Sequence, residues 1–174
     1  MSARLTTAIK IGDAARGVYR KTKSIPDSLV SGCFDPEEHE HPGVEPMLLA
    51  LSMELALKAW FVFDFDDPNV PKTHNLVKLY DQLRPESQTK LDIEFQRTVL
   101  PYHPDFGPLR YSIRDLLFQH KDAFTDWRYM HEARKSMSFN TGTFEATLEM
   151  VLNEFRKRYR VEKYQPVFGS GSIT

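Results

Sequence analysis

Apolar residues recur at helical spacing along most of the chain, and no stretch alternates convincingly between apolar and polar positions as a half-buried strand does. The pattern predicts helices over residues 3–23, 46–63, 74–83, 86–100, 109–135 (with a break near 121–122) and 143–160. We therefore predict an all-α fold, a single-domain helical bundle of about six helices over residues 1–164. The glycine- and serine-rich residues 165–174 are expected to form a flexible tail.

Three residues are expected to mark helix boundaries. Thr73 precedes the third predicted helix and has a side chain suited to its N-cap, and Asp122 is expected to cap the second half of the fifth. Gly142 is expected to separate the last two helices.

The predicted helix over 46–63, with the sequence PMLLALSMELALKAWFVF, is apolar on nearly every side, which is typical of a helix in the centre of a bundle. Its two charged residues, Glu54 and Lys58, are four positions apart and so share one face. Charges inside an apolar helix are costly unless they are paired. Two interpretations are open: a mutual salt bridge near the bundle surface, or a binding cluster that Glu54 and Lys58 form with His74 and Arg128.

Composition narrows the class of protein. The chain has 174 residues, 41% of them hydrophobic and 27% charged, with a net charge of −1, which excludes a wholly disordered chain and any overall attraction to nucleic acid or anionic membranes. A single cysteine, Cys33, excludes an intrachain disulfide. The most apolar segment, 47–63, is slightly short for a membrane span and is interrupted by charges. We expect a cytoplasmic protein that does not contact a membrane.

The common enzyme signatures, including a glycine-rich phosphate loop, CxxC, HExxH and GxSxG, are absent from the sequence. An acidic loop contains residues able to bind metal, namely Asp35, Glu37, Glu38, His39, Glu40 and His41. These residues lack the paired spacings of a preorganised zinc site, and a solvated loop explains them. We therefore expect no metal site and no cofactor.

The segment AFTDWRYMHE, residues 123–132, concentrates aromatic and charged groups. Phe124, Trp127 and His131 follow helical spacing and form one predicted packing stripe, and Arg128 is positioned to bracket neighbouring helices. Upstream, Arg114 and His120 are separated by five residues, which places them about 120° apart around an undisturbed helix. If a break near His120 or a second chain brings them together, arginine would stabilise phosphate charge while histidine transfers a proton.

Three segments in order resemble the HEPN domain (higher eukaryotes and prokaryotes nucleotide-binding), specifically its uncharacterised bacterial members. They are the Glu-x3-Lys pattern of Glu54 and Lys58, the KTHNL segment at 72–76, and AFTDWRYMHE at 123–132. The resemblance spans roughly residues 46–160. It implies a compact helical bundle, a homodimer, and a role with RNA, a nucleotide or a cognate protein partner in RNA metabolism, toxin–antitoxin pairs or phage defence.

Many HEPN proteins are metal-independent endoribonucleases with an Arg-x4-6-His motif assembled across a dimer. Arg114-x5-His120 fits that spacing, and the polar Asp115 follows the arginine as in the family. The motif usually lies toward the end of the domain, whereas here it precedes residues 123–132. Two functions are therefore expected from the resemblance: an RNA-related protein that cleaves RNA through Arg114 and His120, or a non-catalytic protein-interaction or nucleotide-binding module.

Overall fold

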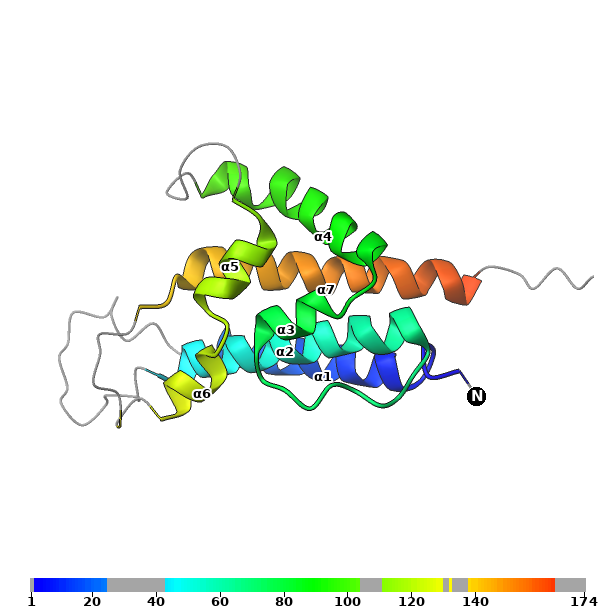
Figure 1. The fold of residues 1–174 in the computed structure, drawn as a ribbon, viewed down its shortest axis with the longest axis horizontal. Coiled ribbons are helices and arrows are strands. Elements are labelled where there is room, and N and C mark those ends of the chain that lie inside the picture. Colours follow the sequence, from blue (N-terminus) through cyan, green and yellow to red (C-terminus); the bar gives the residue numbers. More distant parts are fainter. Residues whose placement is uncertain (1, 25–42, 104–110, 130–131, 133–137, 165–174) are drawn as a thin grey trace, which may run out of the picture.

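A computed structural model describes residues 2–24, 43–103, 111–129, 132 and 138–164, with the backbone alone for 161–164. The described residues form helices only, as predicted (Figure 1). The elements are α1 (Thr7–Thr22), α2 (Val44–Phe65), α3 (Leu76–Asp81), α4 (Pro85–Thr98), the 3-10 helix η1 (Leu100–Tyr102), α5 (Ile113–Gln119), α6 (Ala123–Arg128) and α7 (Thr141–Tyr164). The acidic loop and the C-terminal tail discussed above lie outside the described residues.

Helix α2 forms the centre of the bundle, as its sequence predicts. Side chains from several sides of the helix are fully buried, among them Leu49, Ala50, Ser52 and Val62. By length and composition α2 could also cross a membrane, but 67% of its most apolar window is buried inside the protein. Its contacts are those of a core helix.

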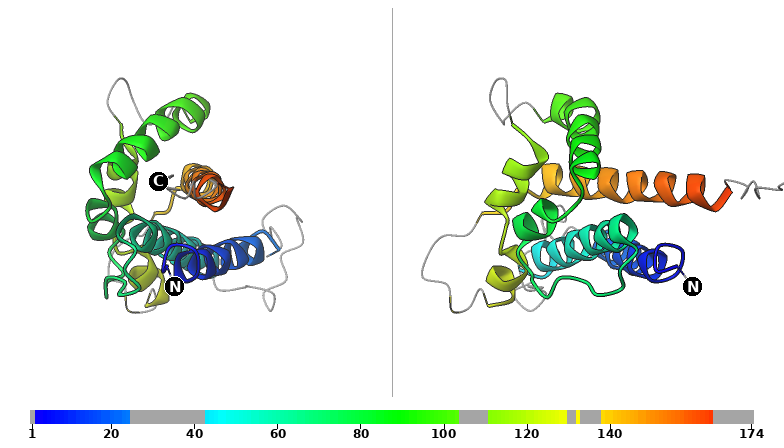
Figure 2. Two further views of the ribbon diagram at one scale, coloured as in Figure 1. Left: turned by 90° about the vertical axis from the view of Figure 1, so that its right-hand side faces the viewer. Right: turned by 45° about the vertical axis from the view of Figure 1, so that its right-hand side comes forward.

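Helix α7 lies between the α1–α2 pair and α4, and the two turned views show the same order (Figure 2). Phe144, Leu148, Val151 and Phe155 form its buried stripe at helical spacing. Trp60 of α2 packs edge-on against Phe155, with ring centroids 5.9 Å apart. The long α7 therefore joins the two sides of the bundle into one core.

Helix α1 packs along α2 and also contacts α7. Gly12 of α1 faces Phe155 of α7, and a Cβ atom added at Gly12 would lie 2.6 Å from Cε1 of that ring. A hydrogen bond from the buried Ser52 hydroxyl to the carbonyl of Ala15, at 2.8 Å, joins α1 to α2. A side chain at position 12 would therefore displace the Phe155 ring.

The structure corrects the predicted helix boundaries. Asn75, not Thr73, is the N-cap of α3, because its side chain accepts a hydrogen bond from the backbone N–H of Lys78 at 3.0 Å. Asp122 occupies the N-cap position of α6, but its carboxylate accepts from the Asn75 amide at 2.8 Å and caps nothing. Gly142 lies inside the first turn of α7. The starts of α3 and α7 therefore differ from the predicted ones by two residues, and the predicted cap at Asp122 is replaced by a contact with Asn75.

Candidate functional site

Glu54 is at the centre of the polar cluster predicted from the sequence. Its side chain is almost fully buried, and both carboxylate oxygens have partners: Lys58 Nζ is 2.6 Å from Oε1, and His74 Nδ1 is 2.9 Å from Oε2. Lys58 is one turn further along α2, so helix geometry alone places it there. His74 comes from the segment that precedes α3. The structure thus brings together three of the four residues predicted for this cluster.

The fourth residue, Arg128, lies elsewhere. It is exposed at the end of α6, and its guanidinium carbon is 5.4 Å from the ring centroid of Tyr129. Among the described residues, no hydrogen bond or ion pair joins it to the cluster. Helix α6 contributes Phe124 instead, whose ring lies 5.0 Å from that of His74. Arg128 is therefore not the buried bracket that the sequence pattern suggested.

The cluster fixes the segment before α3 to the central helix. His74 is about half exposed, with 55% of its side chain accessible, while Glu54 is covered. Because both oxygens of Glu54 are engaged, its buried charge is compensated at this site. The ring of His74 is oriented by the carboxylate on one side and by Phe124 on the other. These contacts join the segment before α3 to both α2 and α6.

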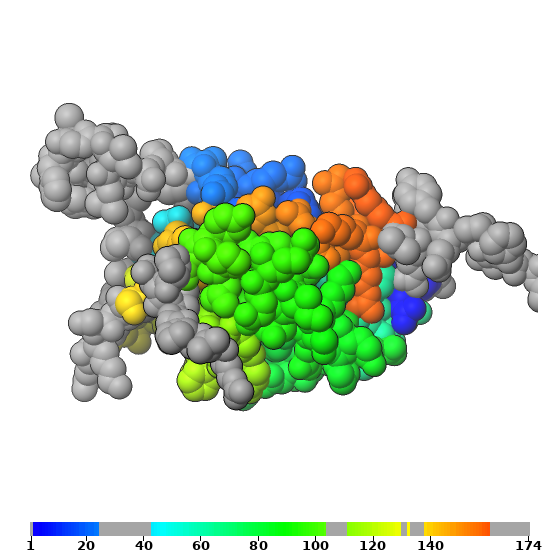
Figure 3. Space-filling view, turned by 90° about the horizontal axis from the view of Figure 1, so that it is seen from above, coloured from blue at the N-terminus to red at the C-terminus, as the bar shows by residue number. Residues whose placement is uncertain are grey.

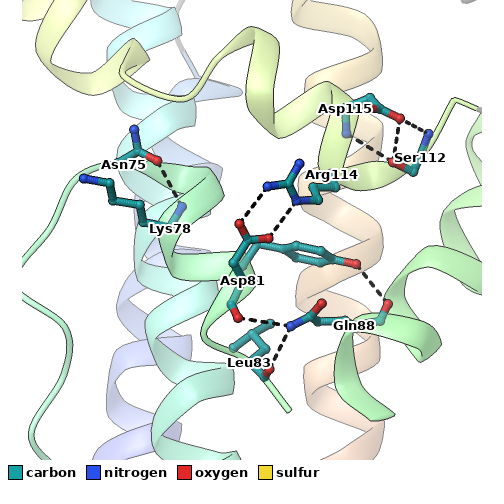
Figure 4. A network of polar contacts seen from close by, with 9 residues as sticks. Asn75, Lys78, Asp81, Leu83, Gln88, Ser112, Arg114 and Asp115 are labelled. Atoms are coloured by element: carbon teal, nitrogen blue, oxygen red, sulfur yellow. Dashed lines mark hydrogen bonds and ion pairs between the residues drawn. The ribbon is translucent and has the colours of Figure 1, made fainter. Parts of the chain in front are cut away.

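Arg114 belongs to a separate network on the outer side of α5. Its Nε and a terminal nitrogen each donate to a different oxygen of Asp81 at 2.8 Å, a bidentate pair that joins α5 to the end of α3 (Figure 4). Half of the Arg114 side chain is exposed. The acidic partner raises the pKa of the guanidinium further, mainly through the hydrogen bonds. Arg114 is therefore a charged surface residue already occupied by a carboxylate.

Neighbouring contacts make this network rigid. The phenol of Tyr80 donates to the backbone carbonyl of Gln88 at 3.0 Å, and the Gln88 amide donates to the carbonyl of Leu83 at 2.8 Å (Figure 4). At the start of α5, Ser112 and Asp115 form a reciprocal capping box. The position after Arg114, which the family resemblance treats as part of a catalytic motif, is therefore explained by helix capping.

His120 points into the core. It follows the last residue of α5, where the chain leaves helical geometry, and only 7% of its surface is exposed. Its ring centroid is 4.5 Å from that of Phe139 and 5.4 Å from that of Phe144. Nε2 is buried without a hydrogen-bond partner, and burial lowers the pKa of His120 to about 4. At neutral pH the imidazole is uncharged.

Arg114 and His120 therefore do not form a pair within one chain. A helix break does occur at His120, as one of the sequence interpretations required, but it directs the imidazole toward Phe139 and Phe144 while Arg114 faces Asp81. A proton-transfer group must reach the proton that it moves. The His120 ring has no such access in this arrangement.

Sequence reasoning missed a second buried carboxylate, Asp64, near the end of α2. The residue is fully buried and accepts hydrogen bonds from the Arg158 guanidinium at 2.6 Å, the Ser87 hydroxyl at 2.7 Å and the backbone N–H of Arg84 at 3.0 Å. Arg158 also lies over the rings of Trp60 and Phe63, at 5.1 and 4.9 Å. The site joins α2, α4 and α7.

A sequence signal for Asp64 did exist. Positions 57, 60 and 64 lie on one face of α2, and Leu57 and Trp60 are apolar, so the stripe continues into a carboxylate. A buried carboxylate requires a cation. Arg158 lies in the basic stretch near the end of the last helix, where cations are expected in any case, so its position in the sequence does not mark it as a buried partner.

In the part of the chain that the structure describes, no three His, Cys, Asp or Glu side chains are grouped so as to hold a metal ion. The residues of the acidic loop are not among those searched. Comparison of the chain with known protein families, with curated proteins and with solved structures finds no match.

Proposed function

We propose that this chain is a HEPN-like helical module with an RNA-related role in bacterial stress, toxin–antitoxin systems or phage defence, and that it binds its target without cleaving it. The resemblance of the three ordered sequence segments supports the first part. The all-helical architecture is compatible with it. The residues of the Glu54–Lys58–His74 cluster come from two of these segments. In this proposal the cluster joins the segment before α3 to α2 and does not contact the target.

One observation supports the second part: the burial of His120. Its imidazole is covered by Phe139 and Phe144, which keeps both ring nitrogens away from an RNA substrate, and its low pKa leaves it uncharged at neutral pH, so that it is not an imidazolium acid. Arg114 is held by Asp81 in a different network. An active site assembled across a homodimer would need both groups on a common surface, and bringing His120 there would require it to leave its core position.

The test is incubation of the purified protein with mixed RNA in EDTA, using wild type, Arg114→Ala and His120→Ala. We expect no cleavage above the buffer control in any of them, and we expect His120→Ala to lower the melting temperature because it leaves a cavity in the core. Cleavage by the wild type that disappears in both variants would establish the endoribonuclease reading and refute this proposal.

A homodimer in the cytoplasm is part of the same proposal. Sedimentation equilibrium of the full chain gives its mass directly, and the expected value is twice the 20.2 kDa of one chain. A monomer at all concentrations would remove the dimer from the proposal and leave the binding function unaffected.

A further inference from the structure

A cavity of about 280 Å³ lies between α1 and α7. Figure 3 shows the two helices beside one another, α1 in blue and α7 in orange. The charged residues that line the cavity are mainly basic: Arg16 and Arg20 come from α1, and Arg156 comes from α7. Asp13 is the one acidic side chain in the lining, so the lining has an excess of two positive charges.

The arginines are available for a ligand. Within the described residues, no carboxylate forms an ion pair with Arg20 or Arg156. The two cations next along α7 differ from them, because Lys157 pairs with Glu154 and Arg158 pairs with Asp64. Arginines that are not paired with a carboxylate are a common means of binding phosphate groups, since each guanidinium presents several donors in a fixed plane.

The cavity is also partly preorganised. A terminal nitrogen of Arg16 donates to the backbone carbonyl of Leu152 at 2.9 Å, which holds this guanidinium across the gap between the helices. The ring of Phe155 lies directly against Gly12. Tyr159, half-buried, lies 5.8 Å from Phe155 between ring centroids and adds a second aromatic ring to the lining. Aromatic rings beside arginines suit the flat base of a nucleotide.

We propose that this α1–α7 cavity binds the phosphate groups of a nucleotide or of an RNA strand, with Arg16, Arg20 and Arg156 as the phosphate-binding residues and Tyr159 beside the base. The choice of these ligands rests on the proposed RNA-related function. The phosphate site itself does not rest on that function, because binding of an inorganic phosphate anion, which has no nucleobase, can be measured by itself.

The experiment measures binding of three probes to the full chain: inorganic pyrophosphate and ATP by calorimetry, and a fluorescent single-stranded RNA by anisotropy. The variant Arg20→Gln/Arg156→Gln removes two exposed charges from the cavity. The matched control, Lys78→Gln/Lys121→Gln, removes two exposed charges from other elements. Circular dichroism and melting temperature check that both variants are folded.

We expect the cavity variant to weaken binding of the probes about tenfold or more, a loss of about 1.4 kcal/mol, and the control to leave it within about twofold. For RNA, the slope of log affinity against log salt should also fall by about 1.4, because two phosphate contacts to a single strand are lost. Asp13→Asn, which removes the one acid, should tighten binding of pyrophosphate.

The two sources of phosphate give different results. Binding of pyrophosphate and ATP without RNA, lost in the cavity variant, identifies a free nucleotide; binding of RNA without ATP, lost in the same variant, identifies a strand. Equal binding by the cavity and control variants, or no binding of any probe at millimolar concentration, overturns the site. RNA cleavage in the EDTA assay would refute the proposed function and leave this site standing, so the two failures are distinguishable.

Discussion

We expect acidification from pH 7 to pH 4 to destabilise the folded protein, because His120 is buried in an uncharged form. The pKa of this imidazole falls from its ordinary value of 6.5 to about 4, because burial among Phe139 and Phe144 disfavours the charged form. Between these values the unfolded chain binds a proton that the folded protein does not. The stability contributed by neutral His120 is therefore fully present above pH 6.5, is lost as the pH falls, and is lost completely below pH 4.

The size of the effect follows from the two pKa values. A difference of one pKa unit corresponds to about 1.4 kcal/mol, so the shift of His120 amounts to about 3 kcal/mol of unfolding free energy at the acidic limit. Domains are stable by only about 5–15 kcal/mol in total, so the loss is readily measured. The buried Nε2 atom accounts for part of the lowered pKa, because in the charged form it would carry an N–H group without a hydrogen-bond acceptor.

The assay is urea unfolding at intervals between pH 7 and pH 4, followed by circular dichroism. Other groups titrate in this range, so the measured quantity is the difference in pH dependence between wild type and His120→Phe, which keeps a ring and removes the titration. Phe118→Leu, at an exposed ring two residues away, is the matched control and should keep the wild-type pH dependence, because it removes an aromatic ring and no titrating group. Identical pH dependence in His120→Phe and wild type, or a His120 pKa near 6.5 by NMR titration, would refute the reasoning.

Two further predictions concern stability. Arg158→Met leaves the fully buried carboxylate of Asp64 without its cation and should lower the free energy of unfolding in urea by about 3 kcal/mol. Arg97→Met, the control at an exposed ion pair, should lower it far less, and equal losses would contradict the role assigned to Arg158. Gly12→Ala places a methyl group 2.6 Å from a ring carbon of Phe155 on α7 and should lower the free energy of unfolding by about 1–3 kcal/mol. The methyl group of Gly17→Ala meets no atom within 4 Å, so this variant should raise the free energy of unfolding by about 0.4–1 kcal/mol. Thermal unfolding of the two variants measures both changes.

The helical architecture could be read from the sequence because it depends on local periodicity. Apolar residues at helical spacing predicted α1, α2, α4 and α7 to within a few residues at most ends. The pairing of Glu54 with Lys58 followed from the same geometry, since residues four apart on a helix are neighbours whatever surrounds them. The contact of Glu54 with His74 belongs to one of the two interpretations that the sequence left open, and the structure shows this contact without Arg128.

Helix ends were less predictable, because several residues compete for each cap. Thr73 and Asn75 both have suitable side chains, and Asn75 became the cap of α3 while its amide also bound Asp122 from a distant part of the chain. A local signal cannot rank such candidates when the outcome depends on a contact 47 residues away.

The sequence by itself therefore determined the helices, the central position of α2 and the charged pair on its face, all of which arise from contacts within one or two turns. Only the tertiary structure decided that His120 lies in the core while Arg114 is exposed, because this depends on how Phe139 and Phe144 approach the end of α5. It alone paired Asp64 with Arg158, 94 residues away, and placed the arginines of α1 and α7 around one cavity. Side-chain contacts between distant segments depend on the packing of whole helices, which no local pattern encodes.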